Sequence, residues 1–184
     1  MQYKGFTLDQ FQIDSIESIN KNHSVVVSAQ TGTGKTLIAD YLINKFIGQN
    51  KRVIYTAPIK ALSNQKFKDF KNDYGEYNVG ILTGDVVINS SAPILVMTTE
   101  IFRNMLITKD PSVEQISFVI FDEIHYISDI ERGTVWEESI IFAPEHIRFL
   151  CLSATIPNAR EFADWISSIK KHQVDVVTYG KRAV

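Results

Sequence analysis

"VVVSAQTGTGKT", residues 25–36, places a glycine-containing loop between an apolar run and a Lys-Thr pair. Gly32 and Gly34 allow the backbone to turn tightly and to aim its N–H groups inward. A helix that begins near Lys35 adds the partial positive charge of its N-terminus. Strand, loop and helix in this order predict a cradle for phosphate groups. In this cradle Lys35 reaches the β- and γ-phosphates of a nucleotide, and the Thr36 hydroxyl ligates Mg²⁺.

The loop departs from the usual phosphate-binding pattern at its first position, because Ala29 stands where that pattern has glycine. The alternative is an ordinary strand–helix turn that carries an exposed lysine. The flanking strand and helix favour the phosphate site. The residues expected to contact the nucleotide are Gln30, Thr31, Gly32, Thr33, Gly34, Lys35 and Thr36.

Short apolar runs alternate with longer amphipathic stretches along the whole chain. The runs are rich in Val and Ile and mostly uninterrupted, as expected for strands that are covered on both faces. The alternation predicts an α/β fold with a doubly wound, mostly parallel sheet and helices on both faces. Such sheets bind ligands outside the carboxyl ends of their strands. The expected strands are residues 24–29, 52–57, 79–82, 94–97, 116–121, 148–152 and 174–177, and the expected helices are 9–20, 35–47, 59–71, 99–107, 135–142 and 158–169.

A pair of adjacent acids ends the apolar run in "VIFDEIHYISDIERG", residues 119–133. Asp122 is placed to make the second protein contact to Mg²⁺, through a metal-bound water. Glu123 would orient and deprotonate the water that attacks the γ-phosphate. The alternative is a strand that reaches the surface and stops in charged residues. The phosphate-binding loop upstream favours the metal and catalytic pair.

Two residues near the N-terminus are candidates for recognising a purine base. In "FTLDQFQ", residues 6–12, Phe6 could stack on the ring, and the Gln12 amide could pair with the N6 and N7 edge of adenine. The alternative is an amphipathic helix that Asp9 caps, with Phe6 and Phe11 in the core. Taken without the rest of the chain, this stretch favours the helix interpretation.

"SAT" at residues 153–155 follows another expected strand. The hydroxyls of Ser153 and Thr155 could bond back to His125 and Asp122, and such a network would couple the γ-phosphate site to a second surface. The alternative is an ordinary strand exit in which Ser and Thr cap the next helix.

Seven stretches together resemble the DExH-box superfamily 2 helicases in order and rough spacing. They are "AQTGTGKT", "APIKALSNQK", "LTGD", "MTTEI", "FDEIH", "ERGTVWEE" and "LSATIPNAREFADWI". "APIKALSNQKF" and "LSATIPNAREFA" are specific to the superkiller-type branch, the exosome-associated RNA helicases. The resemblance covers nearly the whole chain and implies a first RecA-like domain of an ATP-dependent helicase, that is, a P-loop NTPase domain. It also implies that His125 bonds to the Ser153/Thr155 motif or to a partner domain, although a lone histidine can instead be a satisfied surface group.

Further loop clusters have no role in the expected nucleotide site, and each follows an expected strand. Helix N-termini and hydroxyl groups suit the phosphate oxygens of a nucleic acid. The resemblance implies that these loops lie along the sugar–phosphate backbone of a single strand, preferably RNA, with weak sequence preference. The implied contacts are Pro58, Lys60, Gly84, Thr98 and Thr99. The alternative is helix capping beside a solvated, charged helix face.

Composition is that of an ordinary globular domain, with 45% hydrophobic and 22% charged residues among 184. The net charge of −2 gives no basic field, so any nucleic-acid binding must come from local groups. The single cysteine, Cys151, lies in an apolar run, which excludes a disulfide framework and fits an intracellular setting. No apolar run approaches the roughly 20 residues that span a bilayer, so we expect no membrane association.

We expect residues 1–180 to form a single domain and residues 181–184 to begin a linker to a second RecA-like domain. The "QRxGRxG"-like segment that carries arginine fingers in such second domains does not occur in the sequence. The resemblance therefore implies a fragment that binds ATP or ADP with Mg²⁺ and turns over slowly, within a protein that serves an RNA-degradation complex. Two alternatives stay open: a DNA-directed superfamily 2 helicase or motor subunit, and a non-catalytic module that binds nucleotide or RNA.

Overall fold

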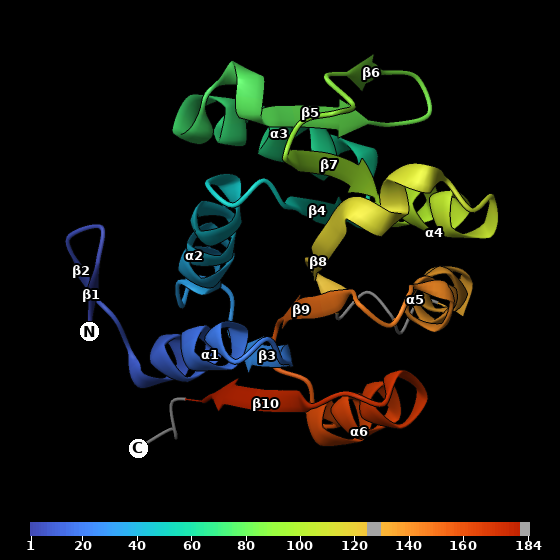
Figure 1. Cartoon of the computed structure of the whole chain (residues 1–184). Helices are drawn as coiled ribbons and strands as arrows, with labels where there is room; N and C mark the ends of the chain where they lie inside the picture. The colour runs from blue at the N-terminus through green and yellow to red at the C-terminus, as the bar shows by residue number, and fades with distance from the viewer. Residues whose placement is uncertain (125–129, 181–184) are drawn as a thin grey trace.

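The computed structural model of the chain describes residues 1–124 and 130–180. Its centre is an eight-stranded sheet with the order β10-β3-β9-β8-β4-β7-β5-β6 (Figure 1). Every neighbouring pair in this sheet is parallel except β5 and β6. The doubly wound, mostly parallel sheet predicted from the sequence is thereby confirmed. The strands are β3 (Ser24–Ala29), β4 (Arg52–Ala57), β5 (Val79–Leu82), β6 (Val87–Ile88), β7 (Ile94–Thr98), β8 (Ile116–Phe121), β9 (Arg148–Ser153) and β10 (Val174–Tyr179).

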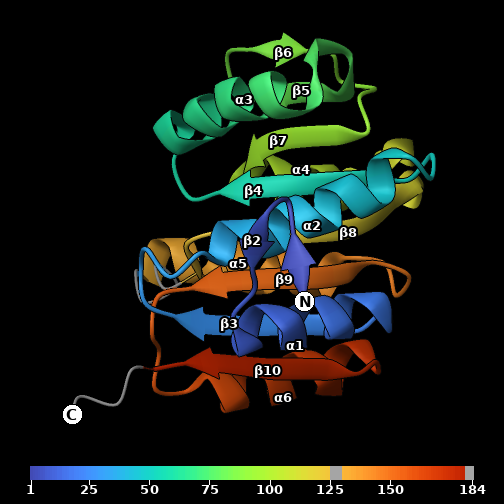
Figure 2. The same cartoon turned by 90° about the vertical axis from the view of Figure 1, so that its left-hand side faces the viewer.

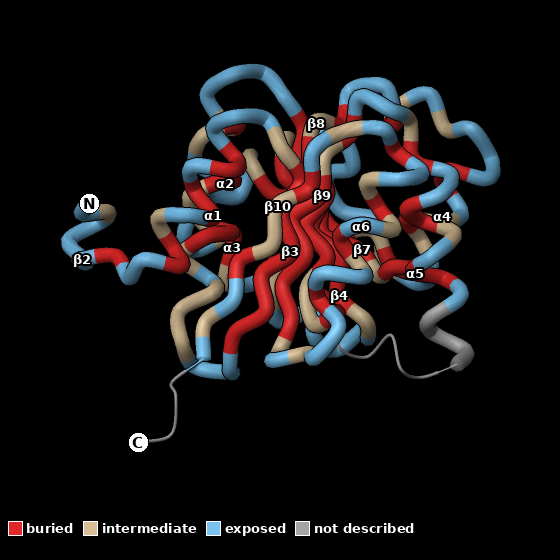
Figure 3. The backbone as a smooth tube through the Cα atoms, turned by 90° about the horizontal axis from the view of Figure 1, so that it is seen from below, coloured by how far each residue is buried: buried red, intermediate tan, exposed pale blue. Residues whose placement is uncertain are grey.

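Helices of the described residues cover both faces of the sheet (Figure 2). One face packs against α1 (Gln10–Asn20), α2 (Lys35–Ile47) and α3 (Lys60–Tyr74). The other packs against α4 (Thr99–Ile107), α5 (Ile130–Phe142) and α6 (Ala159–Lys170). The central strands are buried along their length (Figure 3), which explains why their sequences are continuously apolar rather than alternating.

Parallel pairing brings the carboxyl ends of the strands to one edge of the sheet (Figure 2). The expected phosphate-binding residues, the acid pair and the "SAT" stretch lie at or just after the ends of β3, β8 and β9, which are three adjacent strands. The expected nucleic-acid contacts lie at or just after the ends of β4, β7 and β5, the next three strands. The edge is thus divided into two halves that meet between β8 and β4.

Some boundaries differ from those expected. Helix α3 continues to Tyr74, three residues beyond the expected end, and stops where Gly75 adopts φ 90°. Helix α5 begins at Ile130 rather than at residue 135. Two short hairpins were not expected: β1 (Gln2–Tyr3) with β2 (Phe6–Thr7), and β6 against β5. Strands of two residues are too short to show a period-two pattern, so the sequence gives no signal for them.

Cys151 lies in the core on β9, as expected, and burial raises the pKa of its thiol. Two short 3₁₀ helices, η1 (Glu76–Asn78) and η2 (Pro111–Gln115), lead into β5 and β8. Across residues 1–124 and 130–180, no helix has both the length and the apolar character needed to cross a membrane.

Candidate functional site

The loop between β3 and α2 turns sharply at two glycines. Gly32 and Gly34 have φ values of 82° and 90°, in the left-handed region that glycine enters without strain. Gly34 is also the N-cap residue of α2, so the loop passes directly into the first turn of the helix. Thr33 closes the turn because its backbone N–H donates to the Gln30 carbonyl at 3.3 Å. The sequence-based expectation of strand, tight loop and helix is confirmed at each position.

Lys35 folds back over this loop. Its Nζ donates to the carbonyl oxygens of Ala29 at 2.6 Å and of Gln30 at 2.9 Å. Burial lowers the pKa of the Lys35 ammonium, while the carboxylates of Glu123 and Asp122 act in the opposite direction. The lysine of the loop and the two acids that follow β8 therefore lie within electrostatic reach of one another, although about 90 residues separate them in the chain.

The acid pair is placed by the neighbouring strand β4. The Asp122 backbone N–H donates to the Thr56 carbonyl at 3.1 Å, which extends the pairing of β8 with β4 by one residue. Asp122 Oδ1 accepts a hydrogen bond from the Glu123 backbone N–H at 2.9 Å. Asp122 Oδ2 accepts one from the Tyr55 hydroxyl. Glu123 has a positive φ of 56°, so the backbone changes direction between the two acids.

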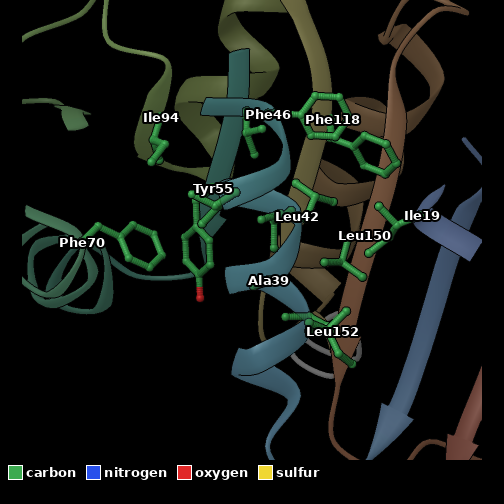
Figure 4. Packing of buried hydrophobic residues seen from close by; sticks show 14 of the residues in the cluster. Ile19, Ala39, Leu42, Phe46, Tyr55, Phe70, Ile94, Phe118, Leu150 and Leu152 are labelled. Carbon is green, nitrogen blue, oxygen red and sulfur yellow. The ribbon is translucent and has the colours of Figure 1, made fainter. Parts of the chain in front are cut away.

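The phosphate-binding loop and the acid pair line one cavity of about 400 Å³. The loop, the first turns of α2 and the acid pair contribute to its lining. Further lining residues come from β4 and α3, where Tyr55 lies between Phe70 and the residues of α2 (Figure 4). The lining residues are Thr31, Gly32, Gly34, Lys35, Thr36, Ala39, Tyr55, Leu62, Lys66, Phe70, Asp122, Glu123 and Leu152.

The donor set of this cavity suits a hard cation such as Mg²⁺. Thr36 offers a hydroxyl and Asp122 a carboxylate, and both are oxygen donors. Within residues 1–124 and 130–180, no three His, Cys, Asp or Glu side chains group together in a way that could hold a metal ion. A metal here would consequently need phosphate oxygens and water as further ligands, which is the usual way in which Mg²⁺ binds at nucleotide sites.

Gln12 contacts the phosphate-binding loop rather than an open base site. It is 4% exposed, its Nε2 donates to the Gly34 carbonyl at 3.0 Å, and its Oε1 accepts from the Asp9 backbone N–H at 2.9 Å. This is the helix-capping arrangement that was the alternative interpretation of "FTLDQFQ". Phe6 is 60% exposed on β2, so it is not the core residue of that alternative. Neither Phe6 nor Gln12 lines the cavity, and their contact with adenine stays a prediction.

The "SAT" stretch follows β9, between the loop strand β3 and the acid strand β8. Ser153 is fully buried, and its hydroxyl donates to the Ala154 carbonyl at 2.7 Å rather than to Asp122. Thr155 is exposed, and Ile156 N–H binds the Ser28 hydroxyl at 3.0 Å. The expected bond between Ser153 and Asp122 is therefore not formed here. His125, the other expected partner, lies outside the described residues.

The expected nucleic-acid residues lie together on the other half of the edge. Lys60, in the first turn of α3, forms an ion pair with Asp85 of the loop after β5. Pro58 and Thr98 are half-buried, Thr99 is 6% exposed, and Gly84 is exposed. Lys60, the one lysine among the expected contacts, is thus already paired with an acidic residue, which the sequence did not predict. The "LTGD" and "APIK" stretches nevertheless come together as expected.

Tyr55 and the α3 side of the cavity were missed by sequence reasoning. Leu62, Lys66 and Phe70 follow the helical spacing of four residues along α3 and form one stripe of the wall. Tyr55 is a hydroxyl-bearing residue inside the buried strand "RVIYTA". A buried tyrosine needs a hydrogen-bond partner for its hydroxyl, and this need is the feature of the sequence that could have pointed to Tyr55. Which residue serves as the partner depends on which strand lies next to β4.

Comparison with known proteins agrees with this geometry. A model of the DEAD/DEAH box helicase family matches residues 9–162. The DExH-box ATP-dependent RNA helicase DExH9 of Arabidopsis thaliana is 51% identical over 172 residues, which cover 94% of this chain and 17% of that protein. Superkiller complex protein 2 of Homo sapiens is 49% identical, with 98% and 14% covered. The exosome RNA helicase MTR4 of Mus musculus is also 49% identical, with 94% and 16% covered.

Among solved structures, the DUF1998 helicase MrfA bound to DNA superposes with a TM-score of 0.74 at 21% identity, covering 94% of this chain and 27% of that one. At this identity the likeness concerns the fold alone. The chain spans only 14–17% of the length of the curated relatives named above. The family model, in contrast, extends over most of the chain and includes both the phosphate-binding loop and the acid pair. The chain belongs to the DEAD/DEAH box helicase family.

Proposed function

We propose that the chain is the ATP-binding domain of a superkiller-type, ATP-dependent RNA helicase, which couples hydrolysis of Mg²⁺-bound ATP to translocation on RNA or to its unwinding. The observation that carries the proposal is the single cavity that Lys35 and Thr36 share with Asp122 and Glu123. A strand–helix turn with a merely exposed lysine would not place that lysine beside two acids. The relatives of about 50% identity, which are named as RNA helicases, support the same class.

In this proposal each residue of the cavity has a separate task. Residues 30–34 bind the phosphates through backbone N–H groups, and Lys35 neutralises the β- and γ-phosphates. Thr36 and Asp122 hold Mg²⁺, which when bound withdraws charge from the phosphate oxygens. Glu123 orients the attacking water and accepts its proton. Ser153 and Thr155, with His125, couple this site to the nucleic acid and to a partner domain.

The nucleic-acid ligand that we propose is a single strand of RNA. Pro58, Lys60, Gly84, Thr98 and Thr99 would contact its sugar–phosphate backbone, since they lie at the same edge of the sheet as the nucleotide cavity. RNA is favoured over DNA because the relatives near 50% identity are named as RNA helicases, whereas the DNA-bound neighbour supports only the fold. A non-catalytic module is disfavoured, because all four residues needed for Mg²⁺-dependent hydrolysis line one cavity.

Turnover is proposed to require a second RecA-like domain in the same protein. Arginine fingers in related phosphoryl-transfer systems raise turnover by roughly 10³ to 10⁵, and the sequence contains no segment of that kind. The domain would span residues 1–180 and the linker would begin at residue 181. The names superkiller complex protein 2 and exosome RNA helicase MTR4 support an RNA-degradation complex as partner, and hence an intracellular setting.

Equilibrium binding of ADP with Mg²⁺ to the chain, measured by titration calorimetry, tests the nucleotide site. We expect saturable binding that Lys35→Ala weakens strongly, while Lys68→Ala on the exposed face of α3 has no effect. Steady-state ATP hydrolysis by the chain and by a longer protein with the second domain tests the rest. Rapid RNA-stimulated turnover by the chain alone would contradict the need for a second domain.

A further inference from the structure

Both oxygens of the Asp122 carboxylate are held by hydrogen bonds, one from the residue that follows it after β8 and one from the neighbouring strand β4. The Glu123 backbone N–H binds Oδ1 at 2.9 Å, directly after β8. The Tyr55 hydroxyl binds Oδ2 from β4, the next strand in the sheet. Each carboxylate oxygen has two lone pairs, so each keeps one for a metal ion or a metal-bound water. The carboxylate is thus oriented by the protein and still able to act as a ligand.

The ring of Tyr55 is itself fixed. It is 2% exposed, and it packs edge-on against Phe70 with ring centroids 5.1 Å apart and an interplanar angle of 86°. The Lys66 ammonium lies over the ring at 5.8 Å, and Leu42 of α2 flanks it on the other side (Figure 4). A carboxylate oxygen can only accept, so the Tyr55 hydroxyl is the donor in its bond to Asp122. The hydroxyl therefore cannot turn away from Asp122 without disturbing the packing of α3.

We propose that Tyr55 is a positioning residue for Asp122: its hydroxyl fixes the orientation of the carboxylate and thereby sets the affinity of the site for Mg²⁺ when a nucleotide is bound. The inference rests on the proposed function, because it takes Asp122 as the metal-binding acid. Tyr55 does not touch the nucleotide or the metal in this proposal.

The physical reason lies in the demands of the ion. Mg²⁺ requires near-octahedral geometry and releases its waters reluctantly, so a carboxylate that rotates freely is a poor ligand. Groups that hydrogen-bond to a ligating carboxylate fix its orientation, and their loss usually weakens metal binding about 10- to 100-fold. Without the hydroxyl, the Asp122 carboxylate would keep only the Glu123 N–H as a donor among the described residues, and it could rotate about its side-chain bonds. The Tyr55 ring would still fill its place between α2 and α3.

Tyr55→Phe tests the proposal, because it removes one oxygen atom and keeps the ring. ADP binding is measured by titration calorimetry at saturating Mg²⁺ and again in EDTA. We expect binding in EDTA within about twofold of the unchanged protein and binding with Mg²⁺ weakened about tenfold. The deciding quantity is the magnesium enhancement, which is the dissociation constant of ADP in EDTA divided by that with Mg²⁺. In an Asp122→Asn background, Tyr55→Phe should have no further effect on this ratio.

Tyr74→Phe is the matched control. Tyr74 lies on α3 outside the cavity, and its hydroxyl donates to the Asp40 carboxylate, so the same type of bond is lost. We expect it to leave the magnesium enhancement unchanged. An unchanged enhancement in folded Tyr55→Phe would overturn the positioning role while leaving the nucleotide site intact. If the unchanged protein binds no ADP under either condition, the proposed function and this inference both fall.

Discussion

Gln12 Nε2 donates to the backbone carbonyl of Gly34 at 3.0 Å, which joins the first helix to the phosphate-binding loop. The same side chain accepts from the Asp9 N–H and so closes the capping box of α1. One residue therefore stabilises a helix start and fixes the last residue of the loop before α2. A shift of α1 would therefore also displace the Gly34 carbonyl, because the buried Gln12 amide bonds to both.

Gln12→Ala should lower the free energy of unfolding by about 1–2 kcal/mol, since it removes a cap and leaves the Gly34 carbonyl without its partner. Urea denaturation measures this loss. Gln10→Ala is the control, because the Gln10 amide binds Asp14 on the exposed side of the same helix. The ratio of ATP to GTP affinity in Gln12→Ala tests the separate prediction of adenine recognition. An unchanged ratio would remove Gln12 from the base site and leave it a structural residue.

Gly34→Ala should destabilise the loop for two reasons. An L-residue at φ 90° costs about 1–2 kcal/mol, and the added Cβ would lie 2.7 Å from Gln12 Nε2. Gly48→Ala is the matched control at the other end of α2, where φ is −78° and, apart from adjacent parts of the chain, no atom of the described residues lies within 4 Å of the new Cβ. We expect Gly48→Ala to be neutral or stabilising by about 0.5 kcal/mol. Thermal melts of both variants, followed by ADP titration, compare the two positions, and equal losses would contradict the argument.

His172 should make stability depend on pH. Burial and the nearby charges of Arg148, Lys170 and His23 lower its pKa to about 4 from 6.5. The Ser24 hydroxyl, which accepts from Phe149 N–H, is hydrogen-bonded to His172 Nε2 at 2.6 Å, and burial of the ring favours its neutral form.

The folded protein therefore resists protonation of His172 more than the unfolded chain does. The stability from the neutral ring is fully present above pH 6.5 and is lost as the pH falls toward about 4. Because the ring is partly open to solvent, we expect a loss of about 1–2 kcal/mol. Urea midpoints across this range should fall less steeply in His172→Phe than in the unchanged protein. His146→Gln, at an exposed loop position, should keep the original slope.

The ion pair between Lys60 and Asp85 predicts that substituting one partner or the other changes RNA affinity in opposite directions. Both side chains are largely exposed, so neither change should affect stability by more than about 1 kcal/mol. Asp85→Asn should strengthen binding of single-stranded RNA, because Lys60 becomes free to contact a phosphate. Lys60→Ala should weaken binding and reduce the salt dependence by about one phosphate contact. Fluorescence anisotropy with a labelled oligouridine at several salt concentrations measures both, with Lys68→Ala as the control. Equal binding by all three variants would exclude Lys60 from the RNA surface.

The sequence predicted those parts of the fold and of the site that depend on residues close together in the chain. The two glycines and the Lys-Thr pair lie within six residues, so their loop could be predicted together with the strand and helix that flank it. The continuous apolar runs likewise located the seven longer strands, because strands buried on both faces need no alternation. The two-residue strands β1, β2 and β6 carry no such pattern and were missed.

Contacts between distant residues could not be predicted in the same way. Tyr55 and Asp122 are 67 positions apart, and they meet only because β4 and β8 are neighbours in the sheet. Ser153 illustrates the reverse case. Its strand lies in the expected place, but its hydroxyl donates to the adjacent Ala154 carbonyl instead of to Asp122. Strand order and competition from nearby hydrogen-bond acceptors determine such contacts, and the spacing of residues within a motif predicts neither.

Glu123→Gln should separate nucleotide binding from hydrolysis. The substitution keeps the size of the side chain and removes its ability to accept a proton, so the attacking water loses its base. We expect ADP and ATP affinities within about twofold of the unchanged protein, and a rate of hydrolysis lower by about 10² to 10⁴ in the longer, two-domain protein. Single-turnover hydrolysis with excess enzyme measures the chemical step without product release. Glu161→Gln, on the exposed start of α6, is the control. If Glu123→Gln hydrolyses ATP at the normal rate, the base must be another residue, and the positive φ at Glu123 would serve only to turn the chain after β8.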